Sequence, residues 1–124
     1  NDGKPEWVMS KVTEALKDLD NPVVAALGIA FKNDIDDLRE SPSLNIVKRL
    51  GEENPELDVR VVEPNVDELP DSLSAIANVK KQDLQGAVAD ADLILLLVNH
   101  KEFLELDPSN LEDKTVIDTK GIWR

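Results

Sequence analysis

The fold is set by one stretch of the chain, which reads, at residues 23–42, VVAALGIAFKNDIDDLRESP. It begins with an uninterrupted apolar run directly after Pro22, and such a run is typical of a strand buried on both faces. A charged segment follows. Ser41 and Pro42 then predict a helix start, because a serine hydroxyl caps free amide groups and the fixed φ of proline suits a first turn. The stretch therefore predicts a buried strand, a charged loop and a capped helix.

The same patterns recur on both sides of this stretch. Apolar residues at helical spacing predict helices over 5–19, from 42 to an end near Gly51, over 84–91 and over 101–106. Short apolar runs predict strands over 23–28, 57–63, 93–98 and 115–118, with a weaker one near 78–80. Strands and helices thus alternate along most of the chain.

Such alternation indicates right-handed crossovers and a parallel sheet that is covered on both faces. We predict an α/β fold, namely a doubly wound (Rossmann-like) three-layer sandwich with a mainly parallel sheet of about five strands. Ligands of such sheets bind beyond the carboxyl ends of the strands, where the winding reverses. The segments that follow the strands are therefore expected to bring Lys32, Arg39 and Lys120 to one rim of the protein.

Composition and charge limit the function. The chain has 124 residues and no cysteine, which allows one hydrophobic core and excludes a disulfide framework or a cysteine nucleophile within it. The formal net charge of -12 disfavours nucleic acid and anionic membranes as partners, and no apolar run approaches the roughly 20 residues that span a bilayer. The first residues do not form a signal peptide, and we expect the chain to be an excised piece of a larger protein.

Lys32 and Arg39 are candidates for an anion site. An ammonium, a guanidinium and the free amide groups of a helix start all favour phosphate oxygens. The alternative is that both are solvated charges paired with nearby aspartates, and composition alone favours this alternative. Gly28 lacks the partner glycines of G-x-G-x-x-G, so the loop is not a standard dinucleotide cradle. His100 is the sole histidine, and a single histidine at a strand end is more often structural than catalytic.

One motif resembles the signature of a known family. Residues 27–41 match L-G-x-A-F-K-x-x-x-x-D-x-R-x-S at every fixed position. This pattern is similar to the opening of the C-terminal, UDP-binding domain in the UDP-glucose/GDP-mannose dehydrogenase family. Residues 62–65, 97–100 and 116–124 are more similar to the branch that acts on UDP-N-acetyl-D-mannosamine than to the UDP-glucose branch. The resemblance runs from Val23 to Arg124.

The resemblance implies one domain of a larger enzyme. Residues 1–124 would form a single UDP-sugar-binding C-terminal domain, with a leading helix and linker over residues 1–22. The parent would be an NAD-dependent UDP-N-acetyl-D-mannosamine 6-dehydrogenase that makes the uronic acid by two hydride transfers, through intermediates on a cysteine. The partners of this chain would be the UDP-sugar and the missing N-terminal and central domains, in a cytoplasmic homo-oligomer of polysaccharide biosynthesis. Without the cysteine and the NAD fingerprint, this chain alone is expected to be inactive.

The matched positions also imply roles for individual residues. Phe31 and Lys32 are similar to residues that contact the substrate near the uridine diphosphate, and Lys120 to a basic substrate contact after the last strand. Arg39 is similar to the residue that reaches across the domain cleft to NAD. Because a diphosphate carries two charges, more than one cation suits it, and the resemblance favours the anion site over solvated charges. No catalytic residue and no metal ligand are expected within the chain.

Two alternatives remain open. The chain is the same domain of a UDP-glucose or GDP-mannose relative, against which Asn99, His100 and Lys120 argue, or it is a free-standing, non-catalytic nucleotide-binding module. A G-x-G-x-x-G domain and a cysteine motif upstream of the chain would favour the enzyme. Steady-state assays on each sugar nucleotide would choose among the substrates.

Overall fold

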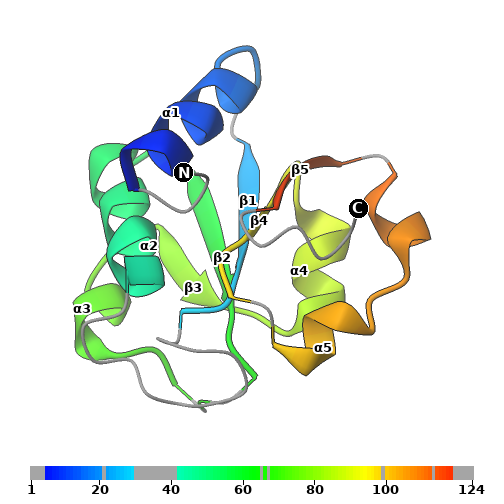
Figure 1. The fold of residues 1–124 in the computed structure, drawn as a ribbon. Coiled ribbons are helices and arrows are strands. Elements are labelled where there is room, and N and C mark those ends of the chain that lie inside the picture. Colours follow the sequence, from blue (N-terminus) through cyan, green and yellow to red (C-terminus); the bar gives the residue numbers. More distant parts are fainter. Residues whose placement is uncertain are drawn as a thin grey trace.

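The computed structural model describes residues 5–20, 22–29, 42–64, 66, 68–98, 100–112 and 114–118. In this part of the chain the strands form one sheet of order β3-β2-β1-β4-β5, and every neighbouring pair is parallel (Figure 1). The strands are Val23–Leu27 (β1), Asp58–Val62 (β2), Val79–Lys81 (β3), Leu93–Leu96 (β4) and Thr115–Asp118 (β5). The winding starts at the central β1 and runs outwards first to β3 and then to β5.

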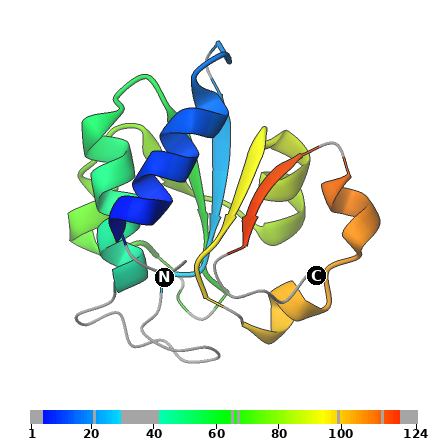
Figure 2. The ribbon, with the colours of Figure 1, turned by 45° about the horizontal axis from the view of Figure 1, so that its top comes forward.

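Helices cover both faces of this sheet, as Figures 1 and 2 show. One face carries α1 (Pro5–Leu16), α2 (Pro42–Glu53) and α3 (Asp71–Ser74). The other face carries α4 (Leu84–Asp90), α5 (Lys101–Leu104) and the 3-10 helix η1 (Pro108–Leu111). The predicted doubly wound three-layer sandwich is therefore confirmed.

Each face of β1 contributes to a separate hydrophobic core. Val24 and Ala26 pack in the core under α1 and α2, whereas Ala25 and Leu27 pack in the core under α4. Successive strand residues point to opposite faces, so the continuous apolar run serves both cores at once. All four side chains are fully buried, which confirms the prediction of a strand buried on both faces.

The helix α1 is part of the packed layer. Val8 and Val12 are buried in the same core as β1, and Trp7 packs against that core from a partly exposed position. The ammonium of Lys11 lies 5.6 Å from the centre of the Trp7 ring, a cation–π geometry. Among the described residues no helix combines the length and the apolar character needed to cross a membrane.

The prediction that α2 ends near Gly51 is wrong, because the helix continues to Glu53. A Cβ at Gly51 would lie 2.5 Å from Cγ2 of Val79 and 3.1 Å from Cγ2 of Ile76. The glycine therefore lets α2 approach β3 closely and does not mark a helix end.

Smaller differences concern element ends. The first helix ends at Leu16 instead of residue 19, and β4 ends at Leu96 instead of residue 98. The helix α5 ends at Leu104 instead of residue 106. The helices α3 and η1 were not predicted, and each is a single turn of four residues, too short to show a hydrophobic period.

Candidate functional site

The carboxyl ends of β1, β2 and β4 lie side by side and remain joined beyond the sheet. The carbonyl of Leu27 accepts hydrogen bonds from the amides of Leu97 at 3.0 Å and Val98 at 3.2 Å. The amide of Gly28 donates to the carbonyl of Val62 at 2.8 Å. The winding of the sheet reverses between β1 and β4, so this edge is where a doubly wound sheet binds its ligand.

Gly28 turns the chain at this edge. Its φ of +96° belongs to a region that side chains with a Cβ rarely adopt, and a Cβ there would lie 2.6 Å from Cβ of Val98. Val98 thus packs directly against the backbone at this glycine.

A buried polar group lies directly after the turn. The amide of Ile29 donates to Oε1 of Glu63 at 2.9 Å. Nε2 of His100 lies 3.0 Å from each carboxylate oxygen of Glu63, and both side chains are 0% exposed. A carboxylate offers only lone pairs, so His100 donates from Nε2. We call these three residues, Ile29, Glu63 and His100, the buried tie.

The ends of two strands position the buried tie. Glu63 directly follows β2, and His100 is the N-cap residue of α5, with φ of -61° and ψ of 152°. The His100 carbonyl accepts from the amide of Phe103 at 3.0 Å, and the two rings lie 5.4 Å apart between centroids. The histidine is thus a buried, hydrogen-bonded group, which is the structural role that its position at a strand end favours.

The first turn of α2 lies at the same edge (Figure 1). The hydroxyl of Ser43 donates to the carbonyl of Leu97 at 3.4 Å, which places the start of the helix next to the end of β4. The partial positive charge of a helix amino terminus favours anions in its neighbourhood. The edge therefore combines this charge with a rigid backbone.

The predicted site residues Phe31, Lys32, Arg39 and Lys120 lie outside the described residues, as does Asn99. Their expected meeting on one rim stays a prediction. The sequence reasoning assigned no role to Glu63. An acidic residue at the end of an apolar strand and directly before Pro64 was the available signal, since a carboxylate in that position must find partners when it is buried.

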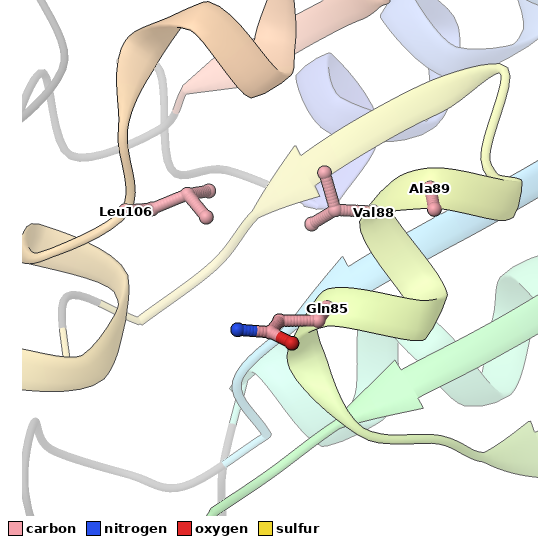
Figure 3. A pocket seen from close by; sticks show the side chains of 4 residues that line it. All are labelled: Gln85, Val88, Ala89 and Leu106. Carbon is pink, nitrogen blue, oxygen red and sulfur yellow. The ribbon is translucent and has the colours of Figure 1, made fainter.

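Two cavities among the described residues lie on this side of the molecule, one beside the carboxyl edge and one against α4. One of about 240 Å³ has walls that include Glu63, Pro64, Lys81 and Glu102, beside the carboxyl ends of β2 and β3. A second of about 310 Å³ is lined by Gln85, Val88, Ala89 and Leu106, and Figure 3 shows Leu106 facing α4 across it. None of the described residues that line it is charged.

The described residues contain no group of three or more histidine and acidic side chains that could hold a metal ion. The sheet order, the reversal beside β1 and the polar carboxyl edge define a doubly wound domain of the nucleotide-binding kind. Residues 25–124 match the UDP binding domain of the UDP-glucose/GDP-mannose dehydrogenase family. The chain belongs to this family.

Curated relatives of the chain are dehydrogenases of sugar nucleotides. The UDP-N-acetyl-D-mannosamine dehydrogenase of Campylobacter jejuni is 48% identical over 86% of this chain and 26% of its own length. The enzyme of the same name from Yersinia pestis is 39% identical over 100% of this chain and 31% of its own length. The NDP-N-acetyl-D-galactosaminuronic acid dehydrogenase of Ralstonia nicotianae is 40% identical over 99% of this chain and 28% of its own length. The chain thus spans less than a third of the length of these relatives.

Solved structures agree with the family. The native UDP-N-acetyl-mannosamine dehydrogenase of Staphylococcus aureus is 31% identical, with a TM-score of 0.73 over 95% of this chain and 27% of that one. The GDP-mannose dehydrogenase of Pseudomonas aeruginosa has a TM-score of 0.73 over 94% of this chain and 28% of that one. Because the two are only 22% identical, this likeness supports the fold of the chain and not its function.

Proposed function

We propose that this chain is the UDP-sugar-binding domain of an NAD-dependent UDP-N-acetyl-D-mannosamine 6-dehydrogenase. The match of residues 25–124 to the UDP binding domain carries the proposal. The carboxyl edge supports it, since it combines a helix amino terminus with the reversal of the sheet. The parent enzyme would oxidise the C6 alcohol of the sugar to a carboxylate by two hydride transfers.

The proposed contacts divide between the two ligands. Phe31, Lys32 and Lys120 contact the UDP-sugar, and Arg39 contacts NAD. The rest of NAD would bind to parts of the protein outside this chain, because Gly28 lacks the partner glycines of G-x-G-x-x-G. The parent is proposed to be a homo-oligomer in the cytoplasm.

The test uses the full-length protein that contains this chain. Lys32→Ala should weaken UDP binding and raise the KM for the UDP-sugar, whereas Arg39→Ala should mainly raise the KM for NAD. Each lost charge-assisted contact should cost about 1.5–3 kcal/mol. Calorimetry with UDP and steady-state assays measure these effects.

The matched control is Lys17→Ala. Lys17 is exposed and directly follows α1, whose carboxyl end lies beside the amino end of β1 and away from the carboxyl edge of the sheet (Figure 2). The Lys17→Ala variant loses the same charge as Lys32→Ala and should leave the affinities for the UDP-sugar and for NAD unchanged. Equal effects of the two lysine variants would contradict the assignment of Lys32.

A second substrate is favoured by one observation. The Ralstonia nicotianae relative, whose name specifies NDP-N-acetyl-D-galactosaminuronic acid, is 40% identical over 99% of this chain. Assays of the full-length protein on UDP-N-acetyl-D-mannosamine and on UDP-N-acetyl-D-galactosamine distinguish the two candidates. The preferred sugar nucleotide should give the higher kcat/KM, with reduction of two NAD per sugar oxidised.

A further inference from the structure

The buried tie bridges three neighbouring strands at their carboxyl ends. Glu63 comes from the end of β2 and His100 from the segment after β4, and these two strands flank β1 in the sheet. The carboxylate reaches over the end of β1, where it accepts the Ile29 amide at 2.9 Å. The tie therefore fixes the backbone at the point where the chain leaves the central strand.

Burial of the Glu63 carboxylate between three strands costs free energy of desolvation. Removal of a charge from water costs several kcal/mol, and well-packed apolar side chains often stabilise a site equally well or better. Hydrogen bonds offset this cost here, and they add a property that apolar contacts lack, namely a fixed distance and direction. The tie thus specifies the local geometry more than it adds stability.

The neighbouring contacts leave the backbone little freedom before the tie. The Gly28 amide is bound to Val62 at 2.8 Å, and the glycine has a φ of +96°. The Ile29 amide is then held by Glu63, so two successive amides are fixed. Glu63, which is itself bound to His100, therefore helps to hold the direction in which the chain leaves β1.

We propose that Glu63 and His100 are positioning residues for UDP binding, which act by holding the backbone at Ile29, where the chain leaves β1. This inference rests on the proposed function, in which the segment that follows β1 contacts the UDP-sugar. Neither side chain touches the nucleotide, because both are fully buried. Their effect on the ligand passes through the backbone.

Two substitutions of Glu63 separate geometry from charge. Glu63→Gln keeps the reach of the side chain, so its amide oxygen can accept from Ile29 and its NH2 group can donate to the other tautomer of His100. Glu63→Asp keeps the charge but is one methylene shorter, so it cannot reach both partners at hydrogen-bond distance. If the tie positions the backbone, the affinity for UDP should depend on the reach of the side chain at position 63 and not on its charge.

The experiment measures the Kd of UDP by calorimetry and the Tm by thermal unfolding, on the full-length protein. Glu63→Asp should weaken UDP binding about tenfold, and Glu63→Gln should stay within about threefold of the unsubstituted protein, as expected for loss or retention of a positioning hydrogen bond. Val59→Ala, a fully buried position near the amino end of β2, is the control for stability alone. It should lower the Tm and leave the Kd unchanged.

The outcomes distinguish the two proposals. If the unsubstituted protein does not bind UDP, the proposed function fails. If it binds UDP and Glu63→Asp binds equally well, or Glu63→Gln is the weaker of the two, the positioning role is wrong. A loss of affinity in Val59→Ala as large as that in Glu63→Asp would also overturn it, because the effect would then follow from stability.

Discussion

Gly28 is the residue whose conformation no other amino acid reproduces at low cost. Its positive φ and its contact with Val98 act together, since an added Cβ would meet both backbone strain and a side chain of the neighbouring segment. Replacement of Gly28 by a residue with a Cβ is therefore costly at the start of the site.

Gly28→Ala should destabilise the protein by about 1–3 kcal/mol, the usual cost of a residue with a Cβ in such a backbone region. Urea denaturation measures the change in the free energy of unfolding. Gly86→Ala in α4 is the control, because Gly86 has no positive φ and the atoms nearest to its Cβ would be side-chain atoms of Gln82 and Asp83. It should cost less, and an equal loss in both variants would contradict the role of the φ angle at Gly28.

Arg60 and Asp58 form an ion pair at the amino end of β2. The guanidinium donates to the two carboxylate oxygens at 2.7 and 2.8 Å, and this hydrogen bonding holds the pKa of Asp58 below its ordinary value of 3.8. A carboxyl group with a lowered pKa stabilises the folded state above its ordinary pKa. That stability is lost as the pH falls through the lowered value.

At neutral pH the free energy of unfolding of the unsubstituted protein should therefore exceed that of the Asp58→Asn variant by about 0.2–1 kcal/mol. This is the range of stabilisation measured for exposed ion pairs. The modest size follows from the exposure of the Asp58 side chain, which is 38%. The difference should shrink as the pH falls below the ordinary value of 3.8. Urea unfolding at a series of pH values measures it, with Asp18→Asn, exposed beyond α1, as the control for loss of a negative charge.

Individual site residues were predictable to different degrees. The place of His100 at a strand end followed from the apolar run before it, and its burial agrees with a structural role. Its partner Glu63 was not predicted, because the two residues are 37 positions apart and only the sheet order brings them together. Contacts of this range depend on topology, which a local pattern does not contain.

At the scale of elements, α2 shows how a glycine inside a helix is explained by its neighbour. Gly51 lies against Val79 of β3, and Asn78 donates to the carbonyls of Gly51, Asn54 and Leu57 from its side-chain amide. The end of α2, the start of β2 and the start of β3 are thus held at short range.

Gly51→Ala should destabilise the protein although alanine favours helices. The gain in helix propensity is about 1 kcal/mol, whereas overpacking against a stiff, buried valine costs about 1–3 kcal/mol. Thermal unfolding should show a lower Tm. In a double-mutant cycle, Val79→Ala should remove most of the penalty, and strictly additive losses would contradict a direct contact.

The elements themselves were largely predictable because most carry a strong period. β1 was predicted within one residue of its end, since an apolar run marks a buried strand. β5 was predicted over residues 115–118, although only Ile117 is buried in it. Element ends and single-turn helices were not predicted, because capping, tight packing at Gly51 and short turns leave weak signals. Sequence pattern thus predicts which elements exist better than where they end.

At the scale of the whole molecule, the net charge of -12 makes self-repulsion a general cost of folding. Added salt should therefore stabilise the protein. Between about 0.01 and 0.1 M salt the screening length falls from about 30 to about 10 Å, so repulsion across the molecule weakens. The Tm should rise by several degrees in NaCl over this range, and a constant or falling Tm would show that local ion pairs outweigh the repulsion.

The strand order also has a consequence in time. β1 pairs with β4, and the amide of Val23 binds a carboxylate oxygen of Asp92, 69 residues further along the chain. At roughly 5–20 residues per second, a ribosome needs several seconds to make that length, and during this time one edge of the central strand β1 has no neighbour. Contacts of such long range also slow folding. A chain that ends at residue 90 should leave the β1 amides on the β4 side, such as that of Val23, open to hydrogen exchange, so the central strand is fully paired only when β4 has been made.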